Sequence, residues 1–201
     1  MDQNAYIDQA AEHFRALLTQ QLQRQERMAQ GSPAKDFAHM DRIVIGLIPG
    51  DGIGPIIMAQ ARRVLERLLA DEIASGRVEL QDIQGLTIEN RTAQGKAIPE
   101  DVLAAIKDCD VLLKGPTETP KGGTLESANV AMRRELDLYA NVRPVSVPEL
   151  GIDWTFFREN TEGEYALGSR GIEVPGMLSM DFKVTTDAGT RRIAKAAFDF
   201  A

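Results

Sequence analysis

The residues best suited to chemistry gather in one run near the middle of the chain, SANVAMRRELDLYANVR, residues 127–143. Helical spacing places Ser127, Asn129 and Arg133 on one side of a predicted helix. A second arginine, Arg143, follows just past the expected end of that helix. The planar guanidinium of arginine binds a carboxylate through two parallel hydrogen bonds, which a lysine ammonium does not do. The run therefore favours a small ligand that carries several carboxylates.

Arg158 and Tyr165 extend this set of polar side chains. Arg158, like Arg133 and Arg143, is expected at or near the end of a predicted element. A tyrosine hydroxyl can serve as a proton donor in catalysis. Any one of these arginines, taken alone, is more typical of a surface residue or a salt bridge. Their joint spacing is what favours a site for a polyanion.

The histidine and cysteine content excludes several kinds of active site. Both histidines, His13 and His39, precede residue 40, so the rest of the chain offers no Ser-His-Asp triad, no Cys-His pair and no histidine zinc site. The single cysteine, Cys109, excludes an internal disulfide and a multi-cysteine metal site. Its place in KDCDVLL, at the start of a predicted strand, favours a small packed residue over a reactive thiol.

A glycine-rich segment, Gly50–Gly54, falls between a predicted strand and a predicted helix with GxGxG spacing. It supports a Rossmann dinucleotide loop only weakly, because Pro55 and the isoleucines after it replace the expected third glycine. No GK[ST] sequence follows, so a phosphate-binding P-loop is excluded. A tight strand-to-helix turn that needs positive φ angles explains most of these glycines.

Periodicity indicates strands that alternate with helices. Residues 1–30 are expected to form one helix that ends at Gly31-Ser32-Pro33 and either packs on the main body or a partner subunit, or forms a flexible extension. The expected strands are 42–48, 77–83, 111–114, 141–145, 155–157 and 177–185, the expected helices are 55–69, 99–107, 127–138 and one capped by Asp187 and ending at Phe200, and a turn-rich loop covers 115–123. This order predicts an α/β protein with some parallel sheet.

Length and charge narrow the class of protein. A chain of 201 residues forms one sizeable domain or the pieces of two. The net charge of −7 and a pI near 5.0 argue against nucleic acid or an anionic membrane as partner. No apolar stretch reaches the roughly 20 residues needed to span a bilayer. The N-terminus has no apolar signal region and is rich in acids, so we expect a cytoplasmic protein.

Four motifs, in this order and spacing, resemble the β-decarboxylating dehydrogenases, the family of isocitrate, 3-isopropylmalate, homoisocitrate and tartrate dehydrogenases. The motifs are IPGDGIGP (48–55), KGPTETP (114–120), SANVAMRRELDLYANVRP (127–144) and RENTEGEY (158–165). The resemblance runs from about Arg42 to Ala201, and the family continues for a comparable length beyond that point. It implies a truncated isopropylmalate/isocitrate dehydrogenase-like fold.

The implied organisation has three parts. Residues 1–40 form a helical N-terminal extension, 41–138 the N-terminal part of a large α/β domain, and 139–201 the beginning of a small domain. The last residues form an apolar helical stretch without a capping glycine, which is typical of a helix that packs on something that follows. We therefore expect an incomplete chain.

The resemblance also assigns roles to individual residues. The substrate-binding positions are Ser127, Asn129, Arg133, Arg143 and Arg158. Tyr165 matches the tyrosine that protonates the enol after decarboxylation. Thr119 matches a position at the nicotinamide ribose, and Asn129 lies near the nicotinamide, so both are assigned to cofactor binding. Ser-x-Asn-x-x-x-Arg after a GPTxTP loop is the isocitrate-type pattern within the family, and isopropylmalate enzymes have apolar residues there.

The chemistry implied is oxidation of a 2-hydroxy acid by hydride transfer to NAD or NADP, followed by loss of CO₂ with help from Mg²⁺ or Mn²⁺. The metal ligands, the lysine from the partner subunit of a homodimer and the adenosine-binding loop are expected in the absent C-terminal half. This chain is therefore expected to hold no metal site and to be inactive alone. One departure from the family pattern is Pro55-Ile56 in place of Pro-Glu, which removes a contact made by that acid.

Other functions stay open at this point. Homoisocitrate, isopropylmalate or tartrate could replace isocitrate as the substrate. A second class of function is a non-catalytic subunit that binds a tricarboxylate without turning it over. A third is a generic α/β anion-binding domain that matches the motifs by chance. Retention of Tyr165 beside the arginines favours an enzyme, because a non-catalytic subunit has no need of that proton donor.

Overall fold

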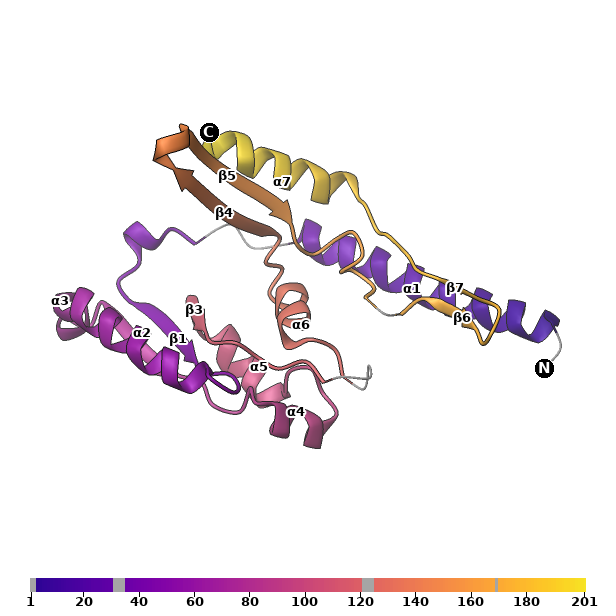
Figure 1. Cartoon of the computed structure of the whole chain (residues 1–201), viewed down its shortest axis with the longest axis horizontal. Helices are drawn as coiled ribbons and strands as arrows, with labels where there is room; N and C mark the ends of the chain where they lie inside the picture. Colours follow the sequence, from indigo (N-terminus) through magenta and orange to yellow (C-terminus); the bar gives the residue numbers. More distant parts are fainter. Residues whose placement is uncertain (1–2, 31–34, 121–124, 169) are drawn as a thin grey trace. The chain divides into compact units, whose positions relative to one another are not determined.

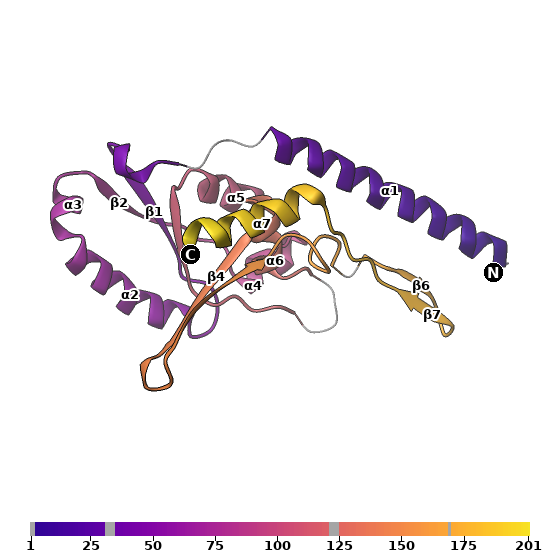
Figure 2. The ribbon, with the colours of Figure 1, turned by 90° about the horizontal axis from the view of Figure 1, so that it is seen from above.

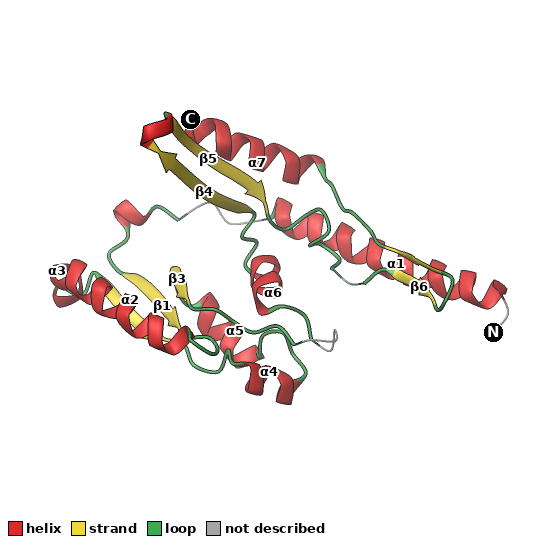
Figure 3. Ribbon diagram, in the orientation of Figure 1, coloured by secondary structure: helices red, strands yellow, loops and turns green. Residues whose placement is uncertain are grey.

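The computed structural model describes residues 3–30, 35–120, 125–168 and 170–201. The chain divides into two compact units. We call Lys35–Asp137 the sheet unit, and Met1–Ala34 together with Leu138–Ala201 the hairpin unit. Helices and strands are labelled along the chain in Figure 1 and distinguished by colour in Figure 3.

The sheet unit is built on three parallel strands in the order β2-β1-β3. The central strand is β1 (Ile43–Ile48), with β2 (Val78–Asp82) and β3 (Val111–Lys114) on either side. Central strands of parallel sheets are buried on both faces and are therefore rich in Val, Ile and Leu, as the sequence IVIGLI of β1 shows. The expected α/β class with parallel sheet is confirmed.

Helices supply the rest of the sheet unit's core. They are α2 (Gly54–Leu68), α3 (Ala70–Ala74), α4 (Ile88–Gln94), α5 (Glu100–Lys107) and α6 (Ala128–Glu135), with a 3-10 turn η1 (Phe37–His39) before β1. The buried core joins residues of β1, α5 and α6 with residues of the segments that connect these elements: Ile48, Ile83, Leu86, Ile98, Val102, Ile106, Cys109, Ala128, Ala131 and Met132. The position of α6 is thus fixed by three of its own buried side chains.

The hairpin unit contains two antiparallel strand pairs. β4 (Ala140–Val147) pairs with β5 (Ile152–Glu159) through a short 3-10 turn η2 (Pro148–Leu150) and a left-handed Gly151. The helix α7 (Asp187–Phe200) lies along β5, where the rings of Phe157 and Phe200 are 5.3 Å apart (Figure 1). β6 (Ile172–Val174) and β7 (Leu178–Met180) form a narrow second hairpin (Figure 2).

The N-terminal helix α1 (Gln3–Ala29) packs on the rest of the hairpin unit. Leu17 is buried with Ala166 and Leu167, and the rings of Phe14 and Phe182 are 5.3 Å apart. Of the two roles expected for this helix, packing on the body is therefore the one observed. Among the described residues, no helix is long and apolar enough to cross a membrane.

Several expected elements differ in extent. The helix expected over 127–138 ends at Glu135, and the strands expected over 141–145 and 155–157 are each eight residues long. The strand expected over 177–185 covers only Leu178–Met180, and beyond it Val184 makes a single bridge to Gly163. The alternation of apolar and polar residues continues beyond the last residue that has a partner strand. The prediction from this pattern was therefore too long.

Other differences concern caps and short elements. Asp187 is not the cap of α7, because the hydroxyl of Thr186 accepts the hydrogen bond from the amide of Gly189 and takes that role. Neither α3 nor α4 nor β6 was expected from the sequence. The helix α1 ends at Ala29, and both Gly31-Ser32-Pro33 and residues 121–123 of the expected loop lie outside the described residues.

Cys109 should react slowly in the folded chain. Its thiol is buried, lies 3.3 Å from the carbonyl oxygen of Ala105, and has a pKa raised above its ordinary value by burial, with a smaller effect from the charges of Asp108 and Asp110. A raised pKa leaves less thiolate, which is the reactive form, at any given pH. We expect alkylation by iodoacetamide at pH 8 to be at least about tenfold slower than in the urea-unfolded chain. Equal rates would show that the thiol is accessible.

Candidate functional site

The helix α6 carries the polar residues of the first candidate group. Ser127 is its N-cap residue, yet the serine side chain makes no capping hydrogen bond. Asn129 and Arg133 are four residues apart and therefore lie on the same side of the helix. The half-buried Arg133 has no hydrogen bond or ion pair with any other described residue. Among the residues that the structure describes, the side chains of Ser127 and Arg133 therefore have no hydrogen-bond partner and are available to a ligand.

The end of β3 and the segment after it add two polar side chains, Lys114 and Thr117, that the sequence had not singled out. The ammonium of Lys114, at the end of β3, donates to the carbonyl of Gly115 at 2.7 Å and to the hydroxyl of Thr117 at 3.1 Å. That hydroxyl lies 3.5 Å from the amide oxygen of Asn129. Burial lowers the pKa of Lys114, and the nearby Asp51 opposes this effect. A lysine at the carboxyl end of a parallel strand is the signal that could have identified it, because ligands bind at that edge of α/β sheets.

The glycine-rich turn has a structural function that Asp51 makes clear. Gly50 adopts φ +76°, and a Cβ there would lie 2.0 Å from the carbonyl oxygen of Pro116. The carboxylate of Asp51 accepts hydrogen bonds from the amides of Ile88 and Glu118, at 2.7 and 2.8 Å. The amide of Asp51 in turn donates to the carbonyl of Pro116 at 2.7 Å. The turn therefore fixes the start of the segment that carries Thr119.

A buried arginine fixes the same segment from the other side. Arg91 of α4 is fully buried, and its guanidinium donates to the carbonyl oxygens of Ala97, Glu118 and Glu126, at 2.8, 2.7 and 2.9 Å. Burial lowers its pKa, and the charge of Asp51 opposes this shift. The bonds to residues 118 and 126 bracket Thr119, whose side chain is exposed. Arg91 was not recognised from the sequence because its partners are backbone carbonyls, which no residue pattern reveals.

In the hairpin unit, Arg143 and Arg158 project from one face of the β4–β5 pair. Arg143 is opposite Phe156 and Arg158 is opposite Asn141, and residues two apart on a strand share a face. The guanidinium of Arg143 donates to the side-chain oxygen of Asn141 at 3.0 Å. Arg158 is the second-last residue of β5, whereas Arg143 lies in the middle of β4 rather than near an element end.

Tyr165 completes this second group. The guanidinium of Arg158 donates a hydrogen bond to the hydroxyl of Tyr165 and lies 5.2 Å from the centre of its ring. Both residues line a pocket of about 320 Å³. Lys183 also lines this pocket, on a segment that contributes no motif, so the sequence gave no reason to single it out.

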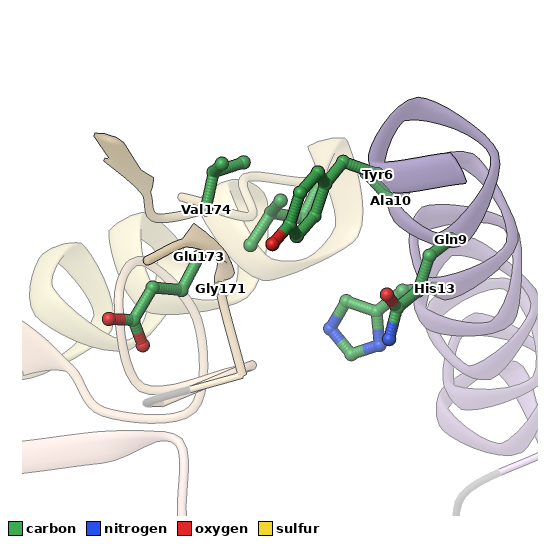
Figure 4. A pocket seen from close by; sticks show the side chains of 8 residues that line it. Tyr6, Gln9, Ala10, His13, Gly171, Glu173 and Val174 are labelled. Atoms are coloured by element: carbon green, nitrogen blue, oxygen red, sulfur yellow. The ribbon is translucent and has the colours of Figure 1, made fainter. Parts of the chain in front are cut away.

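A second pocket in the hairpin unit lies between α1 and β6, with a volume of about 260 Å³. Figure 4 shows Tyr6 and His13 pointing from the helix toward the strand, whereas the side chain of Glu173 points away from the helix. A ring nitrogen of His13 lies 3.0 Å from the carbonyl oxygen of Arg170. None of the candidate site residues lines this pocket.

The candidate residues are thus divided between the two units. Ser127, Asn129, Arg133 and Thr119 belong to the sheet unit, and Arg143, Arg158 and Tyr165 belong to the hairpin unit. Within each unit the structure brings its members onto one helix, one segment or one sheet face. Among the described residues, no group of three or more His, Cys, Asp or Glu side chains could hold a metal ion.

Comparisons with known proteins match these motifs. The model of the family described as isocitrate/isopropylmalate dehydrogenase matches residues 44–201. The mitochondrial "Isocitrate dehydrogenase [NAD] regulatory subunit 2" of Arabidopsis thaliana is 39% identical over 163 residues, 78% of this chain and 41% of that protein. The "Isocitrate dehydrogenase [NADP]" of Haloferax volcanii is 32% identical over 206 residues, 88% of this chain and 48% of that protein. The chain therefore spans less than half the length of these relatives.

Solved structures agree with the sequence comparison. The crystal structure of an apo β-decarboxylating dehydrogenase from Thermococcus kodakarensis matches with a TM-score of 0.58 and 31% identity, over 78% of this chain and 45% of that one. A structure from Thermus thermophilus matches with a TM-score of 0.63 and 31% identity, over 83% of this chain and 35% of that one. The match extends to less than half of each solved chain.

Replacement of Arg91 by alanine should destabilise the sheet unit. The change leaves three carbonyl oxygens without their buried donor, and we expect a loss of about 3 kcal/mol in the free energy of unfolding. Urea unfolding followed by alkylation of Cys109, which lies in the same unit, measures it. The control is Arg63→Ala on α2, whose exposed guanidinium donates to the side chain of Gln60, with an expected change within about 0.5 kcal/mol. Equal effects of the two changes would contradict the assigned role of Arg91.

Proposed function

Because the chain belongs to the isocitrate/isopropylmalate dehydrogenase family, we propose that it provides the substrate-binding residues for NAD- or NADP-dependent oxidative decarboxylation of isocitrate to 2-oxoglutarate. The observation that carries this proposal is that three arginines have no carboxylate partner among the described residues. Arg133, Arg143 and Arg158 make no ion pair with another described residue, although the chain has 30 acidic and 23 basic residues. Arginines left without carboxylate partners in an acidic protein are suited to the carboxylates of a ligand.

The division of labour follows from the side chains. The three arginines orient the substrate carboxylates and offset their charge, which is positioning and electrostatic work. Ser127 and Asn129 offer a hydroxyl and an amide on α6, and such polar groups suit a third carboxylate better than an isopropyl group. This difference supports isocitrate over 3-isopropylmalate.

Tyr165 is the proposed proton donor in the last step. After CO₂ has left, the enolate of the product needs a proton at the carbon that lost the carboxylate. The hydroxyl of Tyr165 lines the pocket beside Arg158, and the arginine donates to the phenol oxygen. The pair therefore suits proton delivery at a site that holds an anion.

The cofactor and the metal fit this chain to different degrees. The nicotinamide accepts the hydride when the cofactor is bound, and Thr119 with Asn129 would contact that end of it. Thr119 is exposed on a segment held by Asp51 and Arg91, which suits such a contact. Among the described residues, no group of three or more His, Cys, Asp or Glu side chains could bind Mg²⁺ or Mn²⁺. We also propose that the protein forms a homodimer whose subunits share an active site.

A second candidate is a regulatory subunit that binds isocitrate without turning it over. The Arabidopsis thaliana relatives with 39%, 38% and 36% identity are all named as regulatory subunits, which is the observation that favours it. The presence of Tyr165 beside Arg158 favours the catalytic role.

Calorimetry on this chain tests the substrate class. We expect isocitrate to bind at least about tenfold more tightly than 3-isopropylmalate, and Arg133→Ala and Arg158→Ala each to weaken isocitrate binding by about tenfold or more. Arg63→Ala serves as the matched control and should leave the affinity unchanged, because its side chain lies outside both candidate groups. Equal affinity for the two acids, or unchanged affinity in Arg133→Ala, would refute isocitrate as the preferred ligand.

Kinetics of the native assembly separate the catalytic role from the regulatory one. In a catalytic subunit, Tyr165→Phe should lower kcat for isocitrate by about 100-fold while KM changes little, because the lost hydroxyl acts in a chemical step. Isocitrate binding by the chain should persist in this variant. If kcat is unchanged while isocitrate still binds, the chain is a regulatory subunit instead.

A further inference from the structure

We infer that the N-terminal helix positions the active-site segment Arg158–Tyr165 through a buried contact between Arg24 and Glu162. One guanidinium nitrogen of Arg24 lies 3.3 Å from a carboxylate oxygen of Glu162, and their side chains are only 10% and 5% exposed. The other terminal nitrogen donates to the hydroxyl of Thr161 at 3.0 Å. The helix α1 lies outside residues 44–201, which match the family model, so this contact is an addition to the shared site.

The carboxylate of Glu162 joins three elements at one point. Besides Arg24 of α1, it accepts hydrogen bonds from the amide and the hydroxyl of Thr186, the N-cap residue of α7, at 3.0 and 2.6 Å. A Cβ on Gly189 would lie 2.3 Å from the carboxyl carbon, so only glycine permits this approach. The start of a helix favours a negative charge, and Arg24 supplies a full positive charge that is hydrogen-bonded to Glu162.

Neighbouring side chains make the same segment rigid. The carboxylate of Glu159 accepts hydrogen bonds from the amides of Thr161 and Glu162 and from the hydroxyl of Thr161. Arg192 of α7 donates to that hydroxyl at 2.8 Å and lies 3.7 Å from Glu159. Thr161 is therefore held from one side by α7 and from the other by Arg24 of α1.

The proposed catalytic residues lie at the two ends of this segment. Arg158 precedes Glu159 directly, and the amide of Tyr165 donates to the carbonyl of Glu162 at 3.3 Å. A shift of Glu162 therefore moves the backbone that carries Tyr165. Displacements near 1 Å in a reacting group are enough to reduce rates strongly. Arg24 is thus a positioning residue that acts through Glu162, and its effect on substrate rests on the proposed function.

Stability alone is a weak explanation for such a pair. A buried ion pair recovers in Coulomb attraction roughly what its desolvation costs, so it adds little net stability, while its fixed geometry selects one arrangement of its neighbours. Apolar contacts of Leu17 and Phe14 already hold α1 on the unit. Loss of Arg24 removes a cation that is hydrogen-bonded to the buried carboxylate of Glu162, and we expect the segment to move so that water can replace it.

The test combines amide hydrogen exchange in the ligand-free chain with isocitrate binding. In Arg24→Ala we expect the amides of residues 161–168 and 186–190 to exchange about tenfold faster or more, and isocitrate to bind about tenfold more weakly. The matched control is Arg15→Ala on the same helix, whose side chain is 80% exposed. It should leave both quantities unchanged, and the exchange of α1 itself should stay protected in both variants.

Two further variants separate positioning from a general loss of structure. Arg24→Lys keeps the charge on Glu162 and should restore most of the affinity. Glu162→Gln should weaken binding like Arg24→Ala, and the double variant should be no weaker than either single change, because both act through one contact. Additive effects, no rescue by lysine, or unchanged exchange in Arg24→Ala would each overturn the inference.

The two proposals fail in different ways. If the unaltered chain binds no isocitrate, the proposed function is wrong, and the exchange measurements alone decide whether Arg24 positions the segment. If the unaltered chain binds isocitrate but exchange in Arg24→Ala matches that in Arg15→Ala, the positioning role is wrong and the proposed function stands.

Discussion

A charged side chain that leaves water must find a partner for each of its polar atoms, and this requirement shapes both units of the chain. In the sheet unit, Arg91 meets it with three backbone carbonyls, which fixes residues 118 and 126 on either side of the segment with Thr119. In the hairpin unit, Glu162 meets it with Arg24 and Thr186, which fixes the start of the turn that leads to Tyr165. Neither Arg91 nor Glu162 is itself a candidate site residue. Both determine where candidate site residues lie.

The ion pairs of other arginines can be compared with Arg133 of the candidate site, which is unpaired among the described residues. Several arginines outside the candidate site have nearby carboxylates, such as Arg62 with Asp82 and Arg134 with Glu126. Arg133 is next in sequence to Arg134 and has no such partner among the described residues. Its pairing would have been easy in a chain of net charge −7. Arg63, next to the paired Arg62, also has no carboxylate partner among the described residues, but it is exposed, whereas Arg133 is half-buried, which suits a ligand-binding role better.

Much of the fold could be predicted from sequence, because periodicity reports on long, regular elements. The helix α1, the strand β1 and the helix α2 were each predicted within two or three residues at their described ends. The helix α4 was missed because it has only seven residues and depends on a cap at Thr87 and a left-handed Gly95. The hairpin β6–β7 was missed in part because strands of three residues carry almost no alternation.

The candidate site shows the same limit at the level of side chains. Arginines and a tyrosine in ordered motifs are visible in a sequence, since the motifs resemble a known family. The contact between Arg24 and Glu162 joins residues 138 positions apart, and no local pattern links them. Arg91 and Lys114 act on backbone carbonyls, which have no residue type. The residues that hold the candidate site residues in place could therefore not be predicted from the sequence.

The face of the β4–β5 pair that carries Arg143 and Arg158 also carries Trp154, the only tryptophan of the chain. Its indole is 59% exposed and stands edge-on to Phe156, with ring centres 6.1 Å apart. Indole fluorescence depends on the polarity and charge around the ring. A carboxylate bound by these two arginines changes both within a few residues of Trp154. Trp154 is therefore an intrinsic fluorescent reporter for any ligand that binds at these two arginines of the hairpin unit, with no label required.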